Sequence, residues 1–272
     1  MFCYDQAMNQ ADNSNSSSSF PWANIRIVLV ETSHPGNIGG VARAMKNMQL
    51  ETLYLVSPES FPDPVAFARS SGASDVLENA VVCNSLPEAI SDCRLVIAAT
   101  ARSRTIEWPQ LDAPEAAHEL TSMASSAPVA LVFGRESSGL NNEEVNQCHK
   151  MVSLPANPDF SSLNLACAVQ VLAYEVRLAC LADGSGSGSV PNVKRGDLPA
   201  SSEKLNQLFM HLEDTLLKVD FMPPHRATTL MRKLKRFFFR ARISEEEVAI
   251  FRGIASELDR LDETVKKKRL QE

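Results

Sequence analysis

Short apolar segments alternate with longer helix-like segments over the first two thirds of the chain. The apolar segments, rich in β-branched residues, are Ile25–Val30, Leu53–Val56, Ala80–Val82, Leu95–Ala99, Val129–Phe133 and Met151–Leu154. Runs without polar alternation are typical of strands buried on both faces, and strand–helix alternation is typical of a parallel sheet. The pattern therefore predicts an α/β fold with a mostly parallel six-stranded sheet.

The last third of the chain has a purely helical pattern. Helices are expected over Ser202–Val219, His225–Arg242 and Glu245–Lys268, each with apolar residues at helical spacing that predict a core-facing stripe. A Gly/Ser repeat before them indicates a flexible linker, and the polar N-terminus is typical of disorder. The expected organisation is a disordered segment (1–21), an α/β domain (22–182), a linker (183–199) and a small all-α domain (200–272).

The formal net charge of −6 over 272 residues is unevenly distributed. Residues 200–272 carry 15 basic and 12 acidic side chains, a net of +3, whereas residues 1–199 carry 12 and 21, a net of −9. Six of the cations lie within residues 232–242. If the partner is a nucleic acid, we expect the helical part to supply most of the phosphate contacts.

Several classes of protein are disfavoured by the sequence. The six cysteines form no C-x-x-C pair and no metal-binding spacing with the five histidines. We therefore expect no disulfide framework and no metal site, and we expect the protein to lie in a reducing cytoplasm. No secretory signal is visible at the N-terminus. The apolar stretch Leu163–Ala182 contains Glu175 and Arg177, which disfavours a membrane span.

The loop after the first expected strand carries candidate chemistry. A Pro/Gly segment follows Val30, and a helix is expected from near Ile38 with Asn37 as its N-cap. The N–H groups at such a helix N-terminus can bind a phosphate, which Arg43 and Lys46 could also hold. Taken alone, the segment is better explained as a capped helix packed close to the sheet, with Arg43 in solvent.

A second such loop follows the strand that ends at Phe133. Gly134 and Glu136 would lie at the carboxyl end of this strand, where parallel sheets bind ligands. Asn141 and Glu144 then have the spacing of a capping box that starts a helix. A turn whose glycines serve only the backbone would have the same pattern.

A third loop lies between Met151 and Leu165 and is rich in proline. Ser161 or Ser162 is expected to cap the long helix that follows, with Asn164 in its first turn. Backbone amides here could hold a cofactor, although a loop with a helix cap is an adequate explanation for each residue taken singly.

Together these loops resemble the TrmH-like ribose 2′-O-methyltransferases of the SPOUT superfamily. The resemblance covers residues 24–182 and rests on the ordered motifs SHPGNIGGVARAMKNM, LVFGRESSGL and SLPANPDFSSLNLACAVQVLAYEV, with TARSRTIEWP after the first. It implies a C-terminal trefoil knot, S-adenosylmethionine as cofactor and a homodimer formed through the knotted domain. The helical tail resembles a tRNA-binding extension found in this family, through LFMHLEDTLLKVDF and LMRKLKRFFFRARISEEEVAIFRGI.

The implied activity is 2′-O-methylation of cytidine or uridine at nucleotide 32 of the tRNA anticodon loop. Carried over by position, the catalytic residues are Arg43, Asn37, Glu136, Ser162 and Asn164. The cofactor would be held by Ala99, Thr100, Ala101, Gly134, Leu154, Ser161, Ser162 and Leu163. The tRNA would be bound by Arg43, Arg102, Arg104, Arg232, Lys233, Lys235, Arg236 and Arg240.

The chemistry of Arg43 limits its role. The resemblance assigns it to activating the 2′-hydroxyl, but a guanidinium with a pKa above ~12 is a poor general base. We therefore expect Arg43 to hold the adjacent phosphate and to stabilise the developing alkoxide. His34 is the alternative base because imidazole titrates near neutral pH. Trp108 could stack on RNA beside the two arginines of the TARSR segment.

Two other functions fit parts of the pattern. A dinucleotide-binding oxidoreductase is suggested by the α/β alternation and the first glycine loop, but this loop lacks the G-x-G-x-x-G spacing. A non-catalytic RNA-binding protein would need only the fold and the basic tail. The joint presence of all five candidate catalytic residues disfavours it.

Overall fold

The computed structural model describes residues 20–101, 108–157, 159–160, 162–185 and 198–269. Its centre is a parallel sheet of seven strands in the order β3-β2-β1-β6-β4-β7-β5. The strands are β1 (Ile25–Val30), β2 (Thr52–Val56), β3 (Val81–Cys83), β4 (Leu95–Ala99), β5 (Gln110–Leu111), β6 (Val129–Phe133) and β7 (Lys150–Val152). The predicted parallel α/β sheet is confirmed. The expected count of six strands was wrong, because β5 has two residues and no apolar run to mark it.

The position of β7 is the unusual feature of the sheet. Its residues lie between β4 and the chain that leads into β5. The amide of Thr100 donates to the carbonyl of Val152 at 3.0 Å, and the amide of Met151 donates to the carbonyl of Pro109 at 2.8 Å. β7, which comes late in the sequence, is thus inserted between β4 and β5, which are consecutive strands joined by a short connection. This order is consistent with the trefoil knot, which itself stays a prediction.

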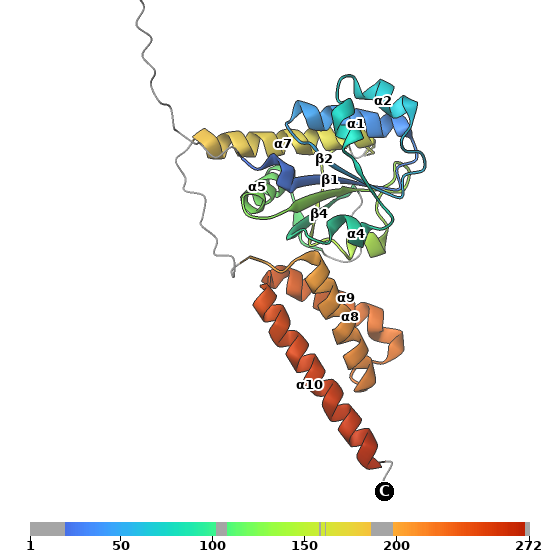
Figure 1. Ribbon diagram of the computed structural model, residues 1–272, viewed down its shortest axis with the longest axis vertical. Helices are drawn as coiled ribbons and strands as arrows, with labels where there is room; N and C mark the ends of the chain where they lie inside the picture. Colours follow the sequence, from blue (N-terminus) through green and yellow to red (C-terminus); the bar gives the residue numbers. More distant parts are fainter. Residues whose placement is uncertain (1–19, 102–107, 158, 161, 186–197, 270–272) are drawn as a thin grey trace, which may run out of the picture.

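One face of the sheet is covered by helices from the same α/β region. These are α1 (Pro35–Asn47), α2 (Pro64–Ser70), α3 (Ser74–Glu78), α5 (Ala113–Ala124) and α7 (Leu165–Ser185), which lie on the upper side of the sheet in Figure 1. Alternate strand residues such as Ile27 and Leu29 pack into this layer and are fully buried. In the described part of the chain α7 alone is long and apolar enough to span a membrane, over Leu165–Ala182, although one side of it packs on α1 and α5.

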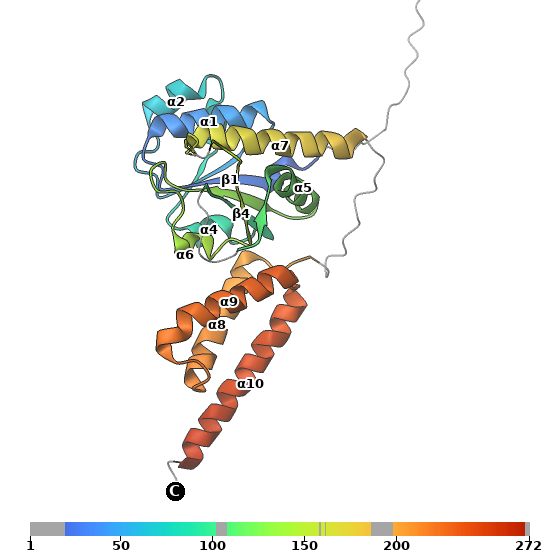
Figure 2. The ribbon, with the colours of Figure 1, turned by 180° about the vertical axis from the view of Figure 1, so that it is seen from behind.

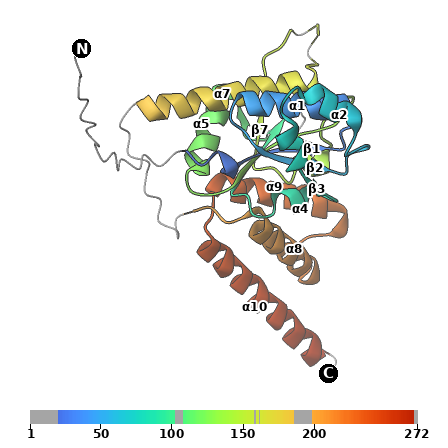
Figure 3. The same ribbon diagram turned by 45° about the horizontal axis from the view of Figure 1, so that its top comes forward.

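The other face of the sheet is covered largely by the C-terminal helices. Below it in Figures 1 and 2 lie α4 (Leu86–Ile90), α6 (Asn142–Val145), α8 (Ser202–Lys218), α9 (Ala227–Ala241) and α10 (Glu245–Arg269), with a short 3-10 turn at Pro224–Arg226. Another 3-10 turn, Trp22–Asn24, precedes β1. The three expected C-terminal helices are confirmed. Val28 and Val132 of the sheet share one core with Phe209, Phe238 and Phe239, so the helical part packs directly on the sheet (Figure 3).

Aromatic residues form the centre of this shared core. Trp108 is 5% exposed, its indole N–H donates to the carbonyl of Cys148 at 3.0 Å, and its ring meets Phe239 edge-on. The prediction that Trp108 stacks on RNA was therefore wrong: its ring is already buried and hydrogen-bonded. The expectation that the α9 phenylalanines are core residues is confirmed for Phe238 and Phe239, whereas Phe237 is half-exposed.

His149 makes this core sensitive to acid. Its ring is buried, and its Nδ1 accepts a hydrogen bond from the Val96 amide at 3.0 Å. Burial, assisted by the charges of Arg242 and Lys150, lowers the pKa of His149 to about 4 from its ordinary 6.5. The unfolded chain therefore binds a proton that the folded chain excludes, and the free energy of unfolding falls as the pH drops from 6.5 towards 4.

We expect His149→Asn to remove part of this sensitivity, because the Asn Oδ1 can still accept from Val96. Between pH 7 and pH 4.5 the wild type should lose about 2 kcal/mol more stability than the variant. Urea unfolding at the two pH values measures the difference, in which all other titrating groups cancel. Equal losses in both proteins would show that His149 is not the responsible group.

Candidate active site

A cleft of about 310 Å³ opens at the carboxyl ends of β4, β6 and β7. It is lined by Ala99, Thr100, Ala101, Phe133, Gly134, Arg135, Glu136, Ser137, Ser138, Gly139, Leu140, Val152, Leu154, Ser162, Leu163, Leu165 and Ala168. The seven predicted cofactor-binding residues that are described all belong to this set, and Ser161 lies outside the described residues. The three loops singled out in the sequence therefore contribute to, or adjoin, one cleft.

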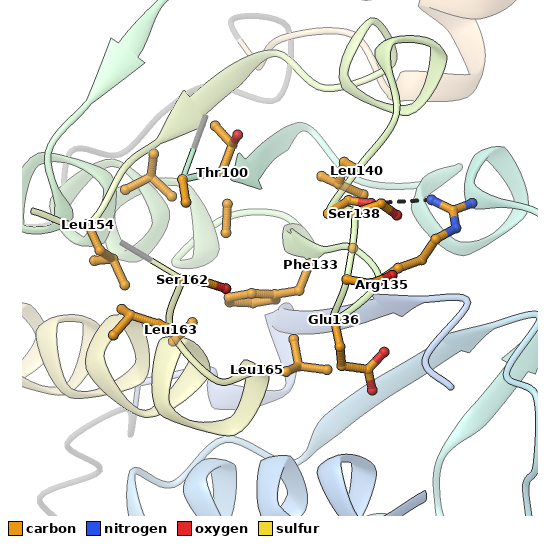
Figure 4. Close-up of a pocket in the computed structure, with 17 residues that line it drawn as sticks. Thr100, Phe133, Arg135, Glu136, Ser138, Leu140, Leu154, Ser162, Leu163 and Leu165 are labelled. Atoms are coloured by element: carbon orange, nitrogen blue, oxygen red, sulfur yellow. Dashed lines mark hydrogen bonds between the residues drawn. The ribbon is translucent and has the colours of Figure 1, made fainter. Parts of the chain in front are cut away.

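The walls of the cleft are mostly uncharged. Leu154 and Leu163 stand on one side, opposite Arg135 and Leu140, and the ring of Phe133 lies between them (Figure 4). Small residues and exposed backbone form much of the rest. Such a surface suits a ligand with an apolar stem and a flat ring, bound largely by backbone groups.

Gly134 allows the cleft loop to fold back on itself. A Cβ atom at this position would lie 2.2 Å from both the Gly139 carbonyl carbon and the Leu140 nitrogen. Gly139 has φ +67°, in the left-handed region that favours glycine. Both glycines are thus required by the turn that forms one wall of the cleft.

Glu136 is the polar centre beside the cleft. Its carboxylate accepts hydrogen bonds from the amide and hydroxyl of Ser33, both at 3.1 Å, from the amide of His34 at 3.2 Å and from the Asn37 side chain at 2.9 Å. Burial would raise its pKa, but the hydrogen bonds from Asn37, Ser33 and His34 outweigh burial and lower the pKa. Glu136 is therefore an ionised acceptor that holds the β1 and β6 loops together.

The hydrogen-bond chain continues into the third loop. The Asn164 side-chain amide donates to Asn37 Oδ1 at 3.1 Å, and Asn37 donates in turn to Glu136. Three predicted site residues from three distant motifs are thereby joined in one line. Ser162, the fourth, lines the cleft directly.

Arg135 locks the same loop from the opposite side. Its guanidinium forms ion pairs with Glu31 at 2.7 Å and with Glu144 at 2.9 Å, and it donates to the carbonyl of Gly139 at 3.3 Å. The hydrogen bonds to Glu144 and Glu31 raise its pKa. The predicted capping box of Asn141 and Glu144 is confirmed. The role of Arg135 had no sequence signal, because its two partners are distant from each other in the chain.

The predicted helix caps differ from the observed ones. His34, not Asn37, caps α1, and its Nδ1 accepts from the Gly36 amide at 3.0 Å. Asn164 precedes α7, and its Oδ1 accepts from the Ala166 amide at 2.9 Å. Because His34 caps the helix, the side-chain amide of Asn37 is free to donate to Glu136.

Arg43 lies apart from the cleft of its own chain. It is exposed on α1, does not line the cleft, and has no hydrogen bond or ion pair to any described residue. Lys46, one turn later, is held by Asp75 at 2.6 Å and by the carbonyl of Gly72 at 3.0 Å. Lys46 is therefore occupied by a structural contact, and Arg43 is the cation of α1 that remains available to a ligand.

Apart from Arg43, the predicted RNA-binding residues divide into three groups. Arg102 and Arg104 lie outside the described residues. Arg232, Lys233, Arg236 and Arg240 share one face of α9 by helical spacing. Lys235 does not share it: its ammonium lies 5.5 Å from the centre of the Phe209 ring, and burial lowers its pKa. The assignment of these residues to RNA binding stays a prediction.

Comparisons with known proteins agree with this arrangement. The SpoU rRNA Methylase family matches residues 24–174, and the C-terminal domain of the tRNA methyltransferase TrmJ matches residues 203–269. The fold and the cleft thus define a methylase built on a parallel α/β sheet. The chain belongs to the SpoU methylase family. Its helical part is the domain type found at the C-terminus of TrmJ.

The chain is similar over most of its length to relatives and to solved structures. It is 48% identical to the tRNA (cytidine/uridine-2′-O-)-methyltransferase TrmJ of Cronobacter sakazakii over 87% of this chain and 96% of the relative. It is 50% identical to TrmJ of Pectobacterium atrosepticum over 87% of this chain and 97% of the relative. The crystal structure of TrmJ from Z. mobilis superimposes with a TM-score of 0.74 at 34% identity, covering 86% of this chain and 98% of that one.

Proposed function

We propose that this protein transfers a methyl group from S-adenosylmethionine to the 2′-hydroxyl of cytidine or uridine at nucleotide 32 of tRNA. The observation that carries the proposal is the hydrogen-bonded line Asn164–Asn37–Glu136 beside the cleft. The similarity to TrmJ over both parts of the chain supports the reaction and the substrate class.

The described cleft fits the cofactor. S-adenosylmethionine, when bound, supplies a methyl group activated by a sulfonium. Gly134 and Gly139 bring backbone close to the ligand, and Leu154 and Leu163 offer an apolar wall to its adenine and methionine stem. The volume of about 310 Å³ lies at the lower end of the range for sites that bind molecules of this size.

The residues beside the cleft position the reaction rather than accept its proton. Glu136 is ionised but engaged by four donors, so its oxygens are poorly placed to act as a base. His34 Nδ1 is occupied by the Gly36 amide, which disfavours it as the base. Arg43 is left to bind the phosphate next to the target ribose and to stabilise its alkoxide, with the proton passing to phosphate or water.

The proposal includes a homodimer formed through α7. Val171, Tyr174, Leu178 and Leu181 are each between 41% and 52% exposed and recur at helical spacing on this helix. An apolar stripe of this kind is typical of a subunit interface. Because Arg43 does not line its own cleft, we place it at the cleft of the second subunit. We also propose the cytoplasm, where tRNA is modified, as the compartment.

Incubation with labelled S-adenosylmethionine and unmodified tRNA, followed by digestion to nucleosides, tests the function. We expect label in 2′-O-methylcytidine or 2′-O-methyluridine. Tight tRNA binding without transfer would favour the non-catalytic alternative. Binding of a nicotinamide dinucleotide in place of S-adenosylmethionine would favour an oxidoreductase.

The basic face of α9 should govern tRNA affinity. Reversing two of its cations in Arg236→Glu/Arg240→Glu should weaken tRNA binding and reduce the slope of log affinity against log salt by about 2, roughly one unit for each phosphate that is no longer neutralised. Cofactor affinity should not change. Filter binding over a salt series measures the slope.

A matched control reverses two cations elsewhere on the helical part, in Lys204→Glu/Arg252→Glu, where both side chains are exposed. Point variants are preferable to a truncation, because removal of α8 and α9 would expose the core they share with the sheet. Equal loss of affinity in both double variants would remove the role of the α9 face.

A further inference from the structure

An apolar stripe runs along α10 and has no partner in the described chain. Ile250, Ile254, Leu258, Leu261 and Val265 are 62%, 52%, 37%, 50% and 47% exposed. Their spacings of four, four, three and four residues keep them on one side of the helix. A stripe of large apolar side chains spanning about 22 Å, at 1.5 Å per residue, is long enough to seat a second helix.

This stripe is distinct from the side of α10 that packs on α8. Val248 and Ala255 are buried there, and the Asp259 carboxylate lies 3.0 Å from the His211 ring nitrogen. By helical spacing the two sides are about 100° apart. Beyond the end of α8 the last turns of α10 run clear of the other helices (Figures 1 and 2). The apolar stripe is therefore not required for folding of the bundle.

We propose that the α10 stripe pairs with the same stripe of a second copy of this chain, in the antiparallel direction. The stripe is symmetric about a point between positions 257 and 258. Antiparallel pairing about this point sets Ile250 against Val265, and Ile254 against Leu261, of the other copy. Leu258 then meets its own equivalent near the two-fold axis. A stripe that complements itself in this way gives an isologous contact, which would join copies independently of the α7 interface.

The charges at the ends of α10 select the same direction. The helix begins with Glu245, Glu246 and Glu247 and ends with four consecutive cations at positions 266–269. Glu245 is paired with Arg94 at 2.8 Å and Lys266 with Asp262 at 2.6 Å, which leaves net negative charge at one end and net positive charge at the other. Antiparallel pairing joins opposite ends, whereas parallel pairing would juxtapose like charges. The stripe itself has no cation to bind phosphate, so RNA is not its occupant.

Disulfide trapping in the full-length protein tests the register. In the double variant Ile254→Cys/Leu261→Cys, the thiol at position 254 of one copy faces the thiol at position 261 of the other. The expected distance is one that a disulfide can bridge. Within one helix the two positions are about 10 Å apart, which excludes an internal disulfide. Mild oxidation should convert most of the double variant to a covalent dimer that a reductant dissolves, and peptide mapping should find position 254 of one copy joined to position 261 of the other.

The two single variants are the matched controls, since each lacks the facing thiol, and the wild type controls for the native cysteines. Unchanged helical circular dichroism verifies folding. Covalent dimer only in the double variant supports the pairing. Covalent dimer in Ile254→Cys alone would indicate parallel pairing and would overturn the proposal. Absence of a new cross-link in any folded variant would overturn it as well.

Discussion

Arg43→Ala should reduce methyl transfer to tRNA roughly 10²–10³-fold, the usual cost of removing one group that stabilises charge in a transition state. Its affinity for S-adenosylmethionine should stay that of the wild type, because Arg43 is assigned to the tRNA phosphate and the ribose alkoxide and not to the cofactor. Single-turnover methylation measures the rate, and calorimetry measures cofactor affinity.

Lys46→Ala is the matched control for Arg43. Lys46 is also an exposed cation on α1, but it is paired with Asp75. Its replacement should leave the methylation rate close to that of the wild type. Near-normal turnover of Arg43→Ala, or equal losses in both variants, would refute the assignment of Arg43 to the reaction.

Gly134→Ala should weaken S-adenosylmethionine binding about tenfold or more, a loss that matches the cost of roughly 1–3 kcal/mol for forcing an extra methyl group into a packed site. The added Cβ would meet backbone atoms of Gly139 and Leu140 at 2.2 Å, so the wall of the cleft must move. Calorimetric titration with the cofactor measures the loss without reference to catalysis.

Gly253→Ala provides the control for this substitution. A Cβ at Gly253 has no atom within 4 Å, and the position lies inside α10. Alanine there should leave cofactor affinity unchanged and stabilise the helix by about 0.5–1 kcal/mol. Unaltered cofactor affinity in a folded Gly134→Ala protein would contradict the placement of the ligand against this loop.

Combining Arg43→Ala with Gly134→Ala, at a cofactor concentration that fills the wild-type cleft but not the Gly134→Ala cleft, identifies the chain on which Arg43 acts. In a mixed dimer the Arg43→Ala chain has an intact cleft and the Gly134→Ala chain has an intact Arg43. If Arg43 serves the partner's cleft, random mixing restores about a quarter of the wild-type sites, since half of the dimers are mixed and each has one complete site. If Arg43 serves its own cleft, mixing restores nothing.

The layout of the sheet could largely be predicted from the sequence, because β4 and β6 are unbroken apolar runs and β1 is interrupted only by Arg26. β1, β4 and β6 have the expected bounds. β5 could not be found, since Gln110 and Leu111 are too short a segment to carry an apolar pattern and are defined by their pairing with β7. The insertion of β7 between β4 and β5 likewise depends on tertiary pairing, and only the family resemblance suggested it.

The residues of the site could be predicted from their motifs, but the contacts between them could not. Glycines at Gly134 and Gly139 and the polar residues Asn37, Glu136 and Asn164 were recognisable in the sequence. Their connection through hydrogen bonds joins positions 99 and 127 residues apart, which no local pattern shows.

Trp108 shows the converse limit of sequence reasoning. An indole close to two arginines suggested RNA contacts. The shared core of the sheet and α9 instead buries the indole.

The most direct test of the account is to locate the transferred methyl group. Unmodified tRNA is incubated with the protein and S-adenosylmethionine and then cut into oligonucleotides, whose masses are measured. The control substrate is the same tRNA with a 2′-deoxyribose at nucleotide 32, treated in the same way. We expect one methyl group on the ribose of nucleotide 32 and none on the deoxy substrate. A methyl group on a base, at another nucleotide, or on the deoxy substrate would contradict it.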